Sequence, residues 1–94
     1  MKATYVVHGF VQGVGYRAYV KGLAEKLGIG GIVMNQEDGS VLIIAQAPGA
    51  DIEKFEKALK ISPKRGMEVM HIEKQYENDE GNRAEIDFNS FQII

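Results

Sequence analysis

The sequence predicts a two-layer α+β sandwich in which two helices cover one face of an antiparallel sheet. Its 94 residues suit one domain, which we expect to span positions 1–94. Hydrophobic residues make up 45% of the chain and charged residues 26%, which supplies a core and excludes a disordered or fibrous chain. Along the chain the apolar pattern switches between strand and helix periods in the order β-α-β-β-α-β, followed by a short terminal strand.

The first strand and the first helix are predicted by a change of period near residue 16. Residues 2–10 are rich in β-branched and aromatic side chains, which is typical of a buried strand. From Tyr16 onward the apolar residues recur at the spacing of an amphipathic helix, which Gly28 would end. The apolar stripe consists of Tyr16, Tyr19, Val20, Leu23, Ala24 and Leu27.

The next two strands are predicted to form a hairpin. Residues 31–35 and 40–46 are short apolar runs, and the segment between them contains the pair Asp38-Gly39. An Asp-Gly pair between two apolar runs is typical of a tight β-hairpin turn. We therefore expect these two strands to pair side by side.

A second helix and a fourth strand follow. Residues 48–51 open a helix with one apolar face, and Ser62-Pro63 ends it. Residues 67–76 predict a strand in which Val69 and Ile72 have opposite parities, so a β-bulge is expected if both face the core. A polar turn then leads to the terminal segment 88–93. Split β-α-β units of this kind give a ferredoxin-like sandwich, a fold that hosts many unrelated functions.

Charge and residue content exclude several classes of function. Eleven basic against thirteen acidic residues give a net charge of −2, so we expect no nucleic-acid partner, which would favour a basic surface. The chain has no cysteine and only two histidines, His8 and His71, which excludes disulfides, a thiolate nucleophile and the usual zinc sites. The uncharged stretch 3–16 is too short and polar to span a bilayer and precedes no signal-cleavage pattern. We therefore expect a cytoplasmic protein without membrane contact.

The stretch 9–17, between the first strand and the first helix, has the residues of an anion site. Its glycines, Gly9, Gly13 and Gly15, allow positive φ angles that turn backbone N–H groups inward. The helix that follows aims its positive dipole end at the same place, and Arg17 adds a guanidinium that matches two phosphoryl oxygens. We interpret the stretch as a phosphate cradle, and a plain connecting loop is the alternative that the residues alone leave open. No Gly-Lys-Ser/Thr follows, which argues against a nucleoside triphosphate.

Three neighbouring features have alternative interpretations. Taken alone, Asn35 before the hairpin turn would be a turn-starting residue. His8 is a potential proton carrier, but a single histidine in a strand is more often packed or exposed, so we do not assign it to the site. Aromatic residues near the cradle could stack on RNA bases, but the basic motif of RNA-binding domains is missing, and the helical spacing of Tyr16 and Tyr19 favours the core.

Two segments resemble the signatures of the acylphosphatase family. The first, Gly9-Phe10-Val11-Gln12-Gly13-Val14-Gly15-Tyr16-Arg17, is similar to the usual Gly-Arg-Val-Gln-Gly-Val-x-Phe-Arg. The second, Gly31-Ile32-Val33-Met34-Asn35-Gln36-Glu37-Asp38-Gly39-Ser40-Val41, is similar to a signature in which an asparagine lies four residues before a glycine. The family has the ferredoxin-like fold that the periodicity predicts.

The resemblance implies an enzyme that hydrolyses acyl phosphates to carboxylate and inorganic phosphate without a metal or a cofactor. By position, Arg17 matches the arginine that binds the phosphoryl group, and Asn35 matches the asparagine that orients the attacking water. The loop amides that the resemblance assigns to phosphate binding belong to Val11, Gln12, Gly13, Val14 and Gly15.

Four positions depart from the family pattern. Phe10 replaces a frequent arginine, which removes one positive charge from the loop. We interpret Tyr16, in place of phenylalanine, and Ile32, in place of a bulky aromatic residue, as packing changes. Ala47 stands where a glycine is common, which bears on the local turn and not on the chemistry.

The expected substrate is thus a small acyl phosphate, with inorganic phosphate or sulfate as a competing anion, and the expected state is a monomer. Domains of this kind also occur within larger carbamoyl-transferring maturation enzymes. A chain that starts at Met1 and ends with the fold favours a free-standing enzyme. The alternative function is a non-catalytic anion-binding or regulatory module on the same ferredoxin-like fold.

Overall fold

The computed structural model describes residues 1–61, 66–77 and 90–94, and its elements follow the predicted order. The elements are β1 (Lys2–Phe10), α1 (Tyr16–Leu27), β2 (Gly30–Asn35), β3 (Val41–Gln46), α2 (Gly49–Leu59), β4 (Glu68–Glu77) and β5 (Phe91–Ile93). The predicted bounds of β1 and α1 agree with these, and those of β2, β3 and β4 differ by one residue at one or both ends. The terminal strand ends at residue 93 as predicted, and its predicted start at residue 88 lies outside the described residues. α2 ends at Leu59, before the proposed stop at Ser62-Pro63, and that pair and the polar turn after β4 lie outside the described residues.

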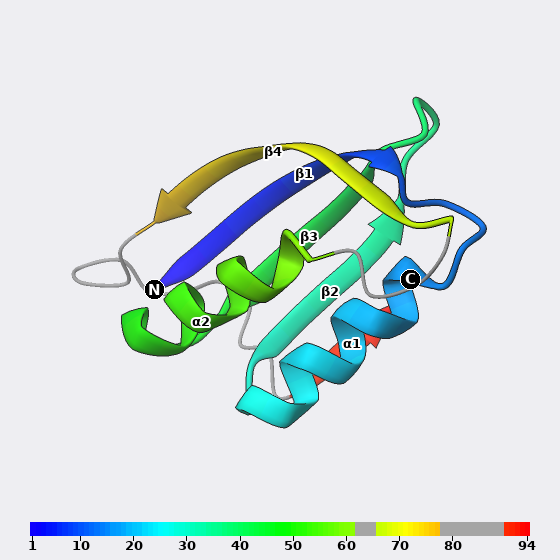
Figure 1. The fold of residues 1–94 in the computed structure, drawn as a ribbon. Helices are drawn as coiled ribbons and strands as arrows, with labels where there is room; N and C mark the ends of the chain where they lie inside the picture. The colour runs from blue at the N-terminus through cyan, green and yellow to red at the C-terminus, as the bar shows by residue number, and fades with distance from the viewer. Residues whose placement is uncertain (62–65, 78–89) are drawn as a thin grey trace.

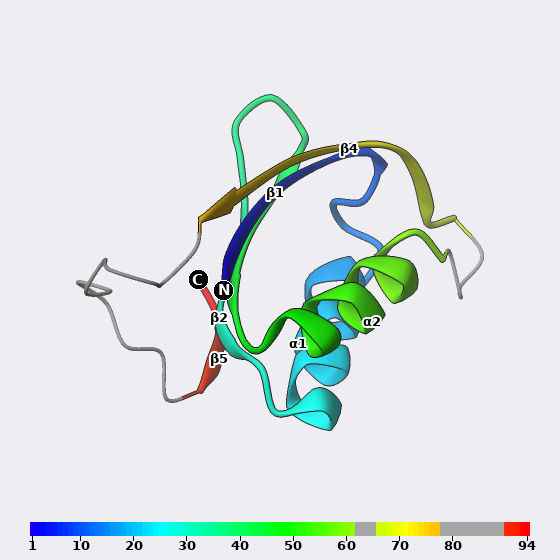
Figure 2. The same ribbon diagram turned by 90° about the vertical axis from the view of Figure 1, so that its left-hand side faces the viewer.

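The strands form one sheet in the order β4-β1-β3-β2-β5, and α1 and α2 lie side by side on one of its faces (Figures 1 and 2). The central pair, β1 and β3, is antiparallel, with Lys2 opposite Gln46 and Val7 opposite Val41. β2 and β3 are also antiparallel and form the predicted hairpin. The predicted ferredoxin-like fold is confirmed.

The terminal strand makes the sheet mixed, because β5 runs parallel to β2. Its direction follows from the path of the chain. β4 ends beside Lys2, and β5 begins at the same end of the sheet, where Phe91 pairs with Gly31. Because β4 runs toward this end and β5 runs away from it, the two strands have opposite directions. β2 also runs opposite to β4, so β5 and β2 have the same direction. The expectation of an antiparallel sheet thus holds for β1 to β4.

The core lies between the sheet and the helices, and alternate residues of the central strands fill it. The buried apolar side chains of the three central strands are Ala3, Tyr5 and Val7 of β1, Val33 of β2, and Val41, Ile43 and Ala45 of β3, and β5 adds Phe91. Helix α1 adds Tyr16, Val20 and Ala24, and α2 adds Ile52, Phe55 and Leu59. The ring of Phe55 lies 6.1 Å from that of Tyr5 and 6.3 Å from that of Phe91, so α2 is anchored across most of the sheet.

The predicted bulge in β4 is present, beside the site. The pairing of β1 and β4 shifts there, because His8 lies opposite His71 and Gly9 lies opposite Val69, which leaves Met70 as the extra residue. Val69 and Ile72 both pack against the core, as the parity argument required. Gly9 has φ 140°, and a Cβ atom there would lie 2.1 Å from the carbonyl oxygen of Glu68. The first of the three signature glycines therefore serves strand packing and lies outside the loop.

Candidate functional site

The loop 11–15 connects β1 to α1 and leaves backbone donors unused. Gly13 and Gly15 have φ angles of 74° and 84°, and Gly15 is the N-cap of α1 without a side-chain capping bond. Within the described parts of the chain, the N–H groups of Gly13, Val14 and Gly15 donate no hydrogen bond. Because the first turn of α1 holds no acidic residue, the loop and the helix end together present N–H donors and a positive dipole to an anion.

A hollow of about 170 Å³ lies against this loop. Its lining residues are Val11, Gly13, Gly15, Tyr16, Arg17, Ala18 and Ile93. Arg17 is half-buried in the first turn of α1. Of the carboxylates in the described ranges, none forms an ion pair with Arg17, so its guanidinium charge is available to an anion in the hollow.

Asn35 is the last residue of β2 and pairs across the hairpin with Val41. Its side-chain oxygen Oδ1 is buried and accepts no hydrogen bond from any residue that the structure describes. A buried amide oxygen without a donor is costly, so this atom is suited to accept a hydrogen from a bound molecule such as water.

The loop and the hairpin turn that follows Asn35 lie at the same end of the sheet (Figure 1). The side chain of Gln12 joins them. The side-chain amide Nε2 of Gln12 donates to the carbonyl oxygen of Gln36 at 2.7 Å and to that of Ser40 at 2.9 Å. The structure therefore brings the loop against the turn that follows Asn35, although Asn35 itself is not among the residues that line the hollow beside Arg17. Sequence reasoning counted Gln12 only as one of the loop amides, and it missed the side-chain contact because no local pattern shows which residues face it.

The turn 36–40 satisfies its own polar groups. The N–H of Gln36 donates to the carbonyl oxygen of Ser40 at 2.9 Å, and the N–H of Ser40 donates to Asp38 Oδ1 at 2.9 Å. The buried Ser40 hydroxyl lies 2.8 Å from Gln36 Oε1 and 2.5 Å from Asp38 Oδ1. The hydrogen bonds from Ser40 lower the pKa of Asp38 below its ordinary value, because they stabilise the carboxylate form.

Two tyrosines of α1 hold the helix that carries Arg17 against the end of α2. The Tyr16 hydroxyl donates to the carbonyl oxygen of Leu59 at 3.1 Å, and the Tyr19 hydroxyl donates to that of Ala58 at 2.9 Å. Burial raises the pKa of the Tyr16 hydroxyl far above its ordinary value. The core assignment of these two tyrosines is confirmed, and Tyr16 adds a hydrogen bond that the phenylalanine of the family pattern lacks.

His8 lies away from the lining of the hollow. Its Nε2 atom is 3.3 Å from Glu73 Oε2, and its ring stacks on that of His71 with the ring centres 5.8 Å apart. Over the parts of the chain that the structure describes, no three histidine or acidic side chains form a group that could hold a metal ion. Within the same parts, no helix is long and apolar enough to cross a membrane.

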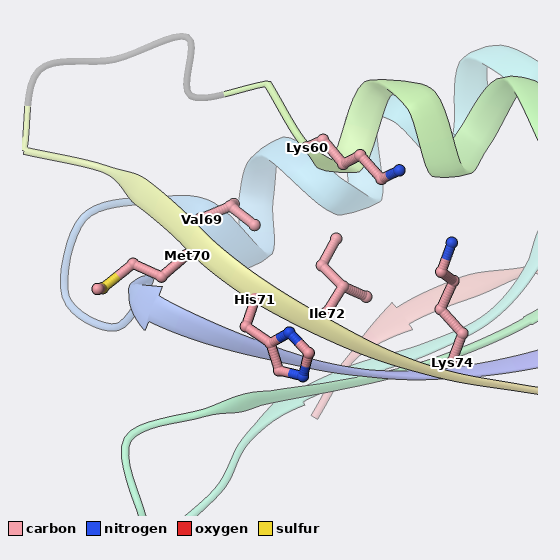
Figure 3. Close-up of a pocket in the computed structure, with 6 residues that line it drawn as sticks. All are labelled: Lys60, Val69, Met70, His71, Ile72 and Lys74. Carbon is pink, nitrogen blue, oxygen red and sulfur yellow. The ribbon is translucent and has the colours of Figure 1, made fainter.

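A second, larger hollow of about 330 Å³ lies between the end of α2 and β4 (Figure 3). Figure 3 shows Lys60 and Lys74 extending toward the space over Ile72. Lys74 is already paired with Glu56, at 3.3 Å between Nζ and Oε1. Because neither the glycine loop nor Arg17 lines this hollow, we assign the anion site to the smaller one.

Comparison with known proteins places the chain in a family. The acylphosphatase family model matches residues 3–93. The acylphosphatase of Latilactobacillus sakei is 56% identical over 57 residues, which are 61% of this chain and 62% of the relative. That of Lactobacillus johnsonii is 44% identical over 70 residues, which are 74% of this chain and 77% of the relative.

Solved structures agree. The crystal structure of acylphosphatase from Bacillus subtilis aligns with a TM-score of 0.87 at 30% identity, covering 99% of this chain and 97% of that one. HypF from T. kodakarensis contains a similar domain, with a TM-score of 0.82 at 27% identity, which makes up 12% of that longer chain. With the unused donors and the arginine in one hollow, these matches show that the chain belongs to the acylphosphatase family of enzymes, which hydrolyse acyl phosphates.

Proposed function

We propose that this chain cleaves the carboxyl–phosphate bond of small acyl phosphates with Arg17 and the amides of loop 11–15 as phosphoryl-binding groups and Asn35 as the water-orienting group. The observation that carries the proposal is a hollow lined by loop N–H groups and by Arg17, none of which bonds to an acceptor among the described residues. The loop N–H groups are fixed by the backbone before the substrate binds, so little reorganisation of these donors accompanies binding.

The phosphoryl oxygens would be held by the loop N–H groups and by the fork of Arg17. In phosphoryl transfer, negative charge on the equatorial oxygens is stabilised mainly by positioned donors and cations. Phe10, which stands in place of a frequent arginine, is 65% exposed. Charge stabilisation in this hollow therefore depends on Arg17 alone among the lining side chains.

The attacking water would be held by Asn35. Its buried Oδ1 accepts a hydrogen from the water and directs an oxygen lone pair toward phosphorus, opposite the carboxylate that leaves. A module that only binds anions has no need for a buried acceptor at the same end of the sheet as its donors. This atom is the feature that favours an enzyme over the non-catalytic alternative.

The leaving group decides which phosphates can react. An acyl phosphate releases a carboxylate whose conjugate acid has a pKa near ~4, so it departs without a proton donor. An alkyl phosphate releases an alkoxide that needs a general acid or a metal. Among the residues that line the hollow, Tyr16 is the candidate for a general acid. Its buried hydroxyl already donates to the carbonyl oxygen of Leu59, and burial raises its pKa, so it is a poor proton donor for a leaving group. The site therefore suits mixed anhydrides.

The test is a set of phosphates incubated with the purified protein in the presence of a chelator. Acetyl and benzoyl phosphate should be hydrolysed, aryl phosphates with acidic phenols at most slowly, and alkyl phosphates not at all. The rate on acyl phosphates should stay nearly flat from about pH 5 to pH 8, because the proposed mechanism uses no side chain as a proton donor or acceptor. Loss of activity in chelator that magnesium or zinc restores would contradict the proposal, and so would efficient hydrolysis of an alkyl phosphate.

A further inference from the structure

We propose that Gln12 is a positioning residue whose side chain sets the place of the phosphate-binding loop relative to Asn35. The inference rests on the proposed function and adds the contact that joins its two halves. Arg17 and the loop amides fix phosphorus, Asn35 fixes the water, and Gln12 would fix the line between them.

The contact uses both N–H groups of the Gln12 side-chain amide. Two carbonyl oxygens, those of Gln36 and Ser40, lie 2.7 Å and 2.9 Å from Gln12 Nε2. Only the NH₂ side of an amide can satisfy two acceptors, so the chemistry of the partners fixes the orientation of the Gln12 side chain. The side chain is partly buried, which shields both bonds from exchange with water.

The turn does not need Gln12 to satisfy its own groups. The carbonyl oxygen of Gln36 also accepts from the N–H of Gly39 at 3.2 Å, and the carbonyl oxygen of Ser40 also accepts from the N–H of Gln36 at 2.9 Å. Each acceptor therefore keeps a partner when the Gln12 amide is removed. What the two extra bonds add is a connection between segments 24 and 28 residues apart in the chain.

The turn is rigid enough to carry this position to Asn35. Gln36 follows Asn35 directly, and Asn35 pairs with Val41 at the end of the β2–β3 ladder. Inside the turn, the Ser40 hydroxyl lies within hydrogen-bond distance of both Gln36 Oε1 and Asp38 Oδ1. A shift of the loop against Gln36 is thus a shift of phosphorus against the Asn35 side chain.

The contact between Gln12 and the turn should affect kcat without affecting the binding of phosphate. Phosphate binding depends on the loop amides and Arg17, which stay together when the join to the hairpin loosens. Attack in line with the leaving group depends on the distance and angle between water and phosphorus, where a misplacement of 1 Å costs about 100-fold in rate. Removal of the Gln12 amide should therefore lower kcat and leave the affinity for inorganic phosphate unchanged.

The experiment compares Gln12→Met with the native protein on acetyl phosphate, with kcat, the Ki of inorganic phosphate and the melting temperature measured for each. Methionine keeps a side chain of similar length and has no N–H to donate. We expect kcat to fall about 10–100-fold at an unchanged Ki, with the variant folded at the assay temperature. Gln12→Asn keeps the amide but is one methylene shorter, so it should reach one carbonyl at most and give an intermediate kcat.

Tyr76→Phe is the matched control, because it removes one side-chain hydrogen bond, to Glu56 Oε1, and neither residue lines the hollow. It should leave both kcat and the Ki of phosphate unchanged. A native kcat in Gln12→Met, a Ki that rises as far as kcat falls, or an equal loss of kcat in Tyr76→Phe would each overturn the positioning role. A native protein inactive on every acyl phosphate would overturn the proposed function instead, so the two failures are distinct.

Discussion

Two turns lie at the same end of the sheet, and they use glycine and polar groups in opposite ways. The loop 11–15 has two glycines with positive φ, and its N–H groups at Gly13 to Gly15 meet no acceptor among the described residues. The turn 36–40 has one such glycine, Gly39, and its backbone and side chains bond to one another. The first turn keeps its donors for a ligand, and the second uses them to stay rigid.

The difference indicates that the two turns have different functions, anion binding for the loop 11–15 and support of Asn35 for the turn 36–40. Donors that bind a transient anion must be left unsatisfied by the protein, which lowers the stability of the loop that carries them. A group that orients water needs a fixed support, and the self-bonded turn after Asn35 provides one. The following predictions test this division, in order of decreasing effect.

The largest effect is expected from Arg17→Gln. Loss of one transition-state donor typically costs about 2.7–4 kcal/mol, or a hundredfold or more in rate. Stability should change little, because Arg17 forms no ion pair with the described carboxylates. Steady-state kinetics and thermal unfolding check both points, and Lys26→Gln, which removes the same charge from the other end of α1, should keep its rate. A folded Arg17→Gln variant with a near-native rate would contradict the assignment.

The second-largest effect is expected from Asn35→Ala, which should distinguish water orientation from phosphate binding. We expect kcat to fall by about 100-fold while inorganic phosphate still binds, because the amide oxygen acts on water and not on the phosphoryl group. The fold should survive, since no described residue donates a hydrogen bond to this oxygen. The measurement is kcat together with the Ki of phosphate. A parallel loss of phosphate affinity would make Asn35 part of the phosphate cradle.

Gly13→Ala and Gly39→Ala form a matched pair across the two turns. Gly13 has φ 74° and Gly39 has φ 92°, and a Cβ atom at either position would meet nothing within 4 Å. Each change should cost about 1–2 kcal/mol through backbone strain alone. Only Gly13→Ala should also lower kcat/KM, by about tenfold, because it displaces unused donors. Urea unfolding and kinetics on both variants check this, and equal kinetic losses would show that the turns do not differ in role.

Much of this molecule could be predicted from its sequence, because local patterns determine it. The change of period at Tyr16 gave the correct start of α1, and the opposite parities of Val69 and Ile72 predicted the β4 bulge. The Asp38-Gly39 pair located the hairpin turn. In each case the residues that decide the structure are neighbours in the chain.

The rest depends on contacts between distant residues. The direction of β5 follows from which end of the sheet the chain reaches after β4, and no periodicity records that. The partners of Gln12 are backbone carbonyls 24 and 28 residues away, so their side chains give no signal. Gly9 looked like a loop glycine because it begins the signature, but the close approach of Glu68 from β4 explains it. The roles of Arg17 and Asn35 stay predictions until the variants are measured.

The smallest expected effect is a change in the pKa of Asp38, which bears on the stability of the turn 36–40 at low pH. The hydrogen bonds from the Ser40 hydroxyl and N–H hold the pKa of Asp38 below its ordinary value. A carboxyl group whose pKa is lower in the folded than in the unfolded state stabilises the fold above its unfolded pKa, and this contribution is lost as the pH falls through the folded pKa, here below about pH 4. Ser40→Ala removes the hydroxyl and keeps the N–H, so the pKa of Asp38 should rise toward its ordinary value without reaching it. An NMR titration of the Asp38 side-chain carbonyl in both proteins measures the change. If Asp38 titrates at the same pH in both, the hydroxyl does not hold the turn, and the rigidity assigned to it must come from the backbone bonds between Gln36 and Ser40.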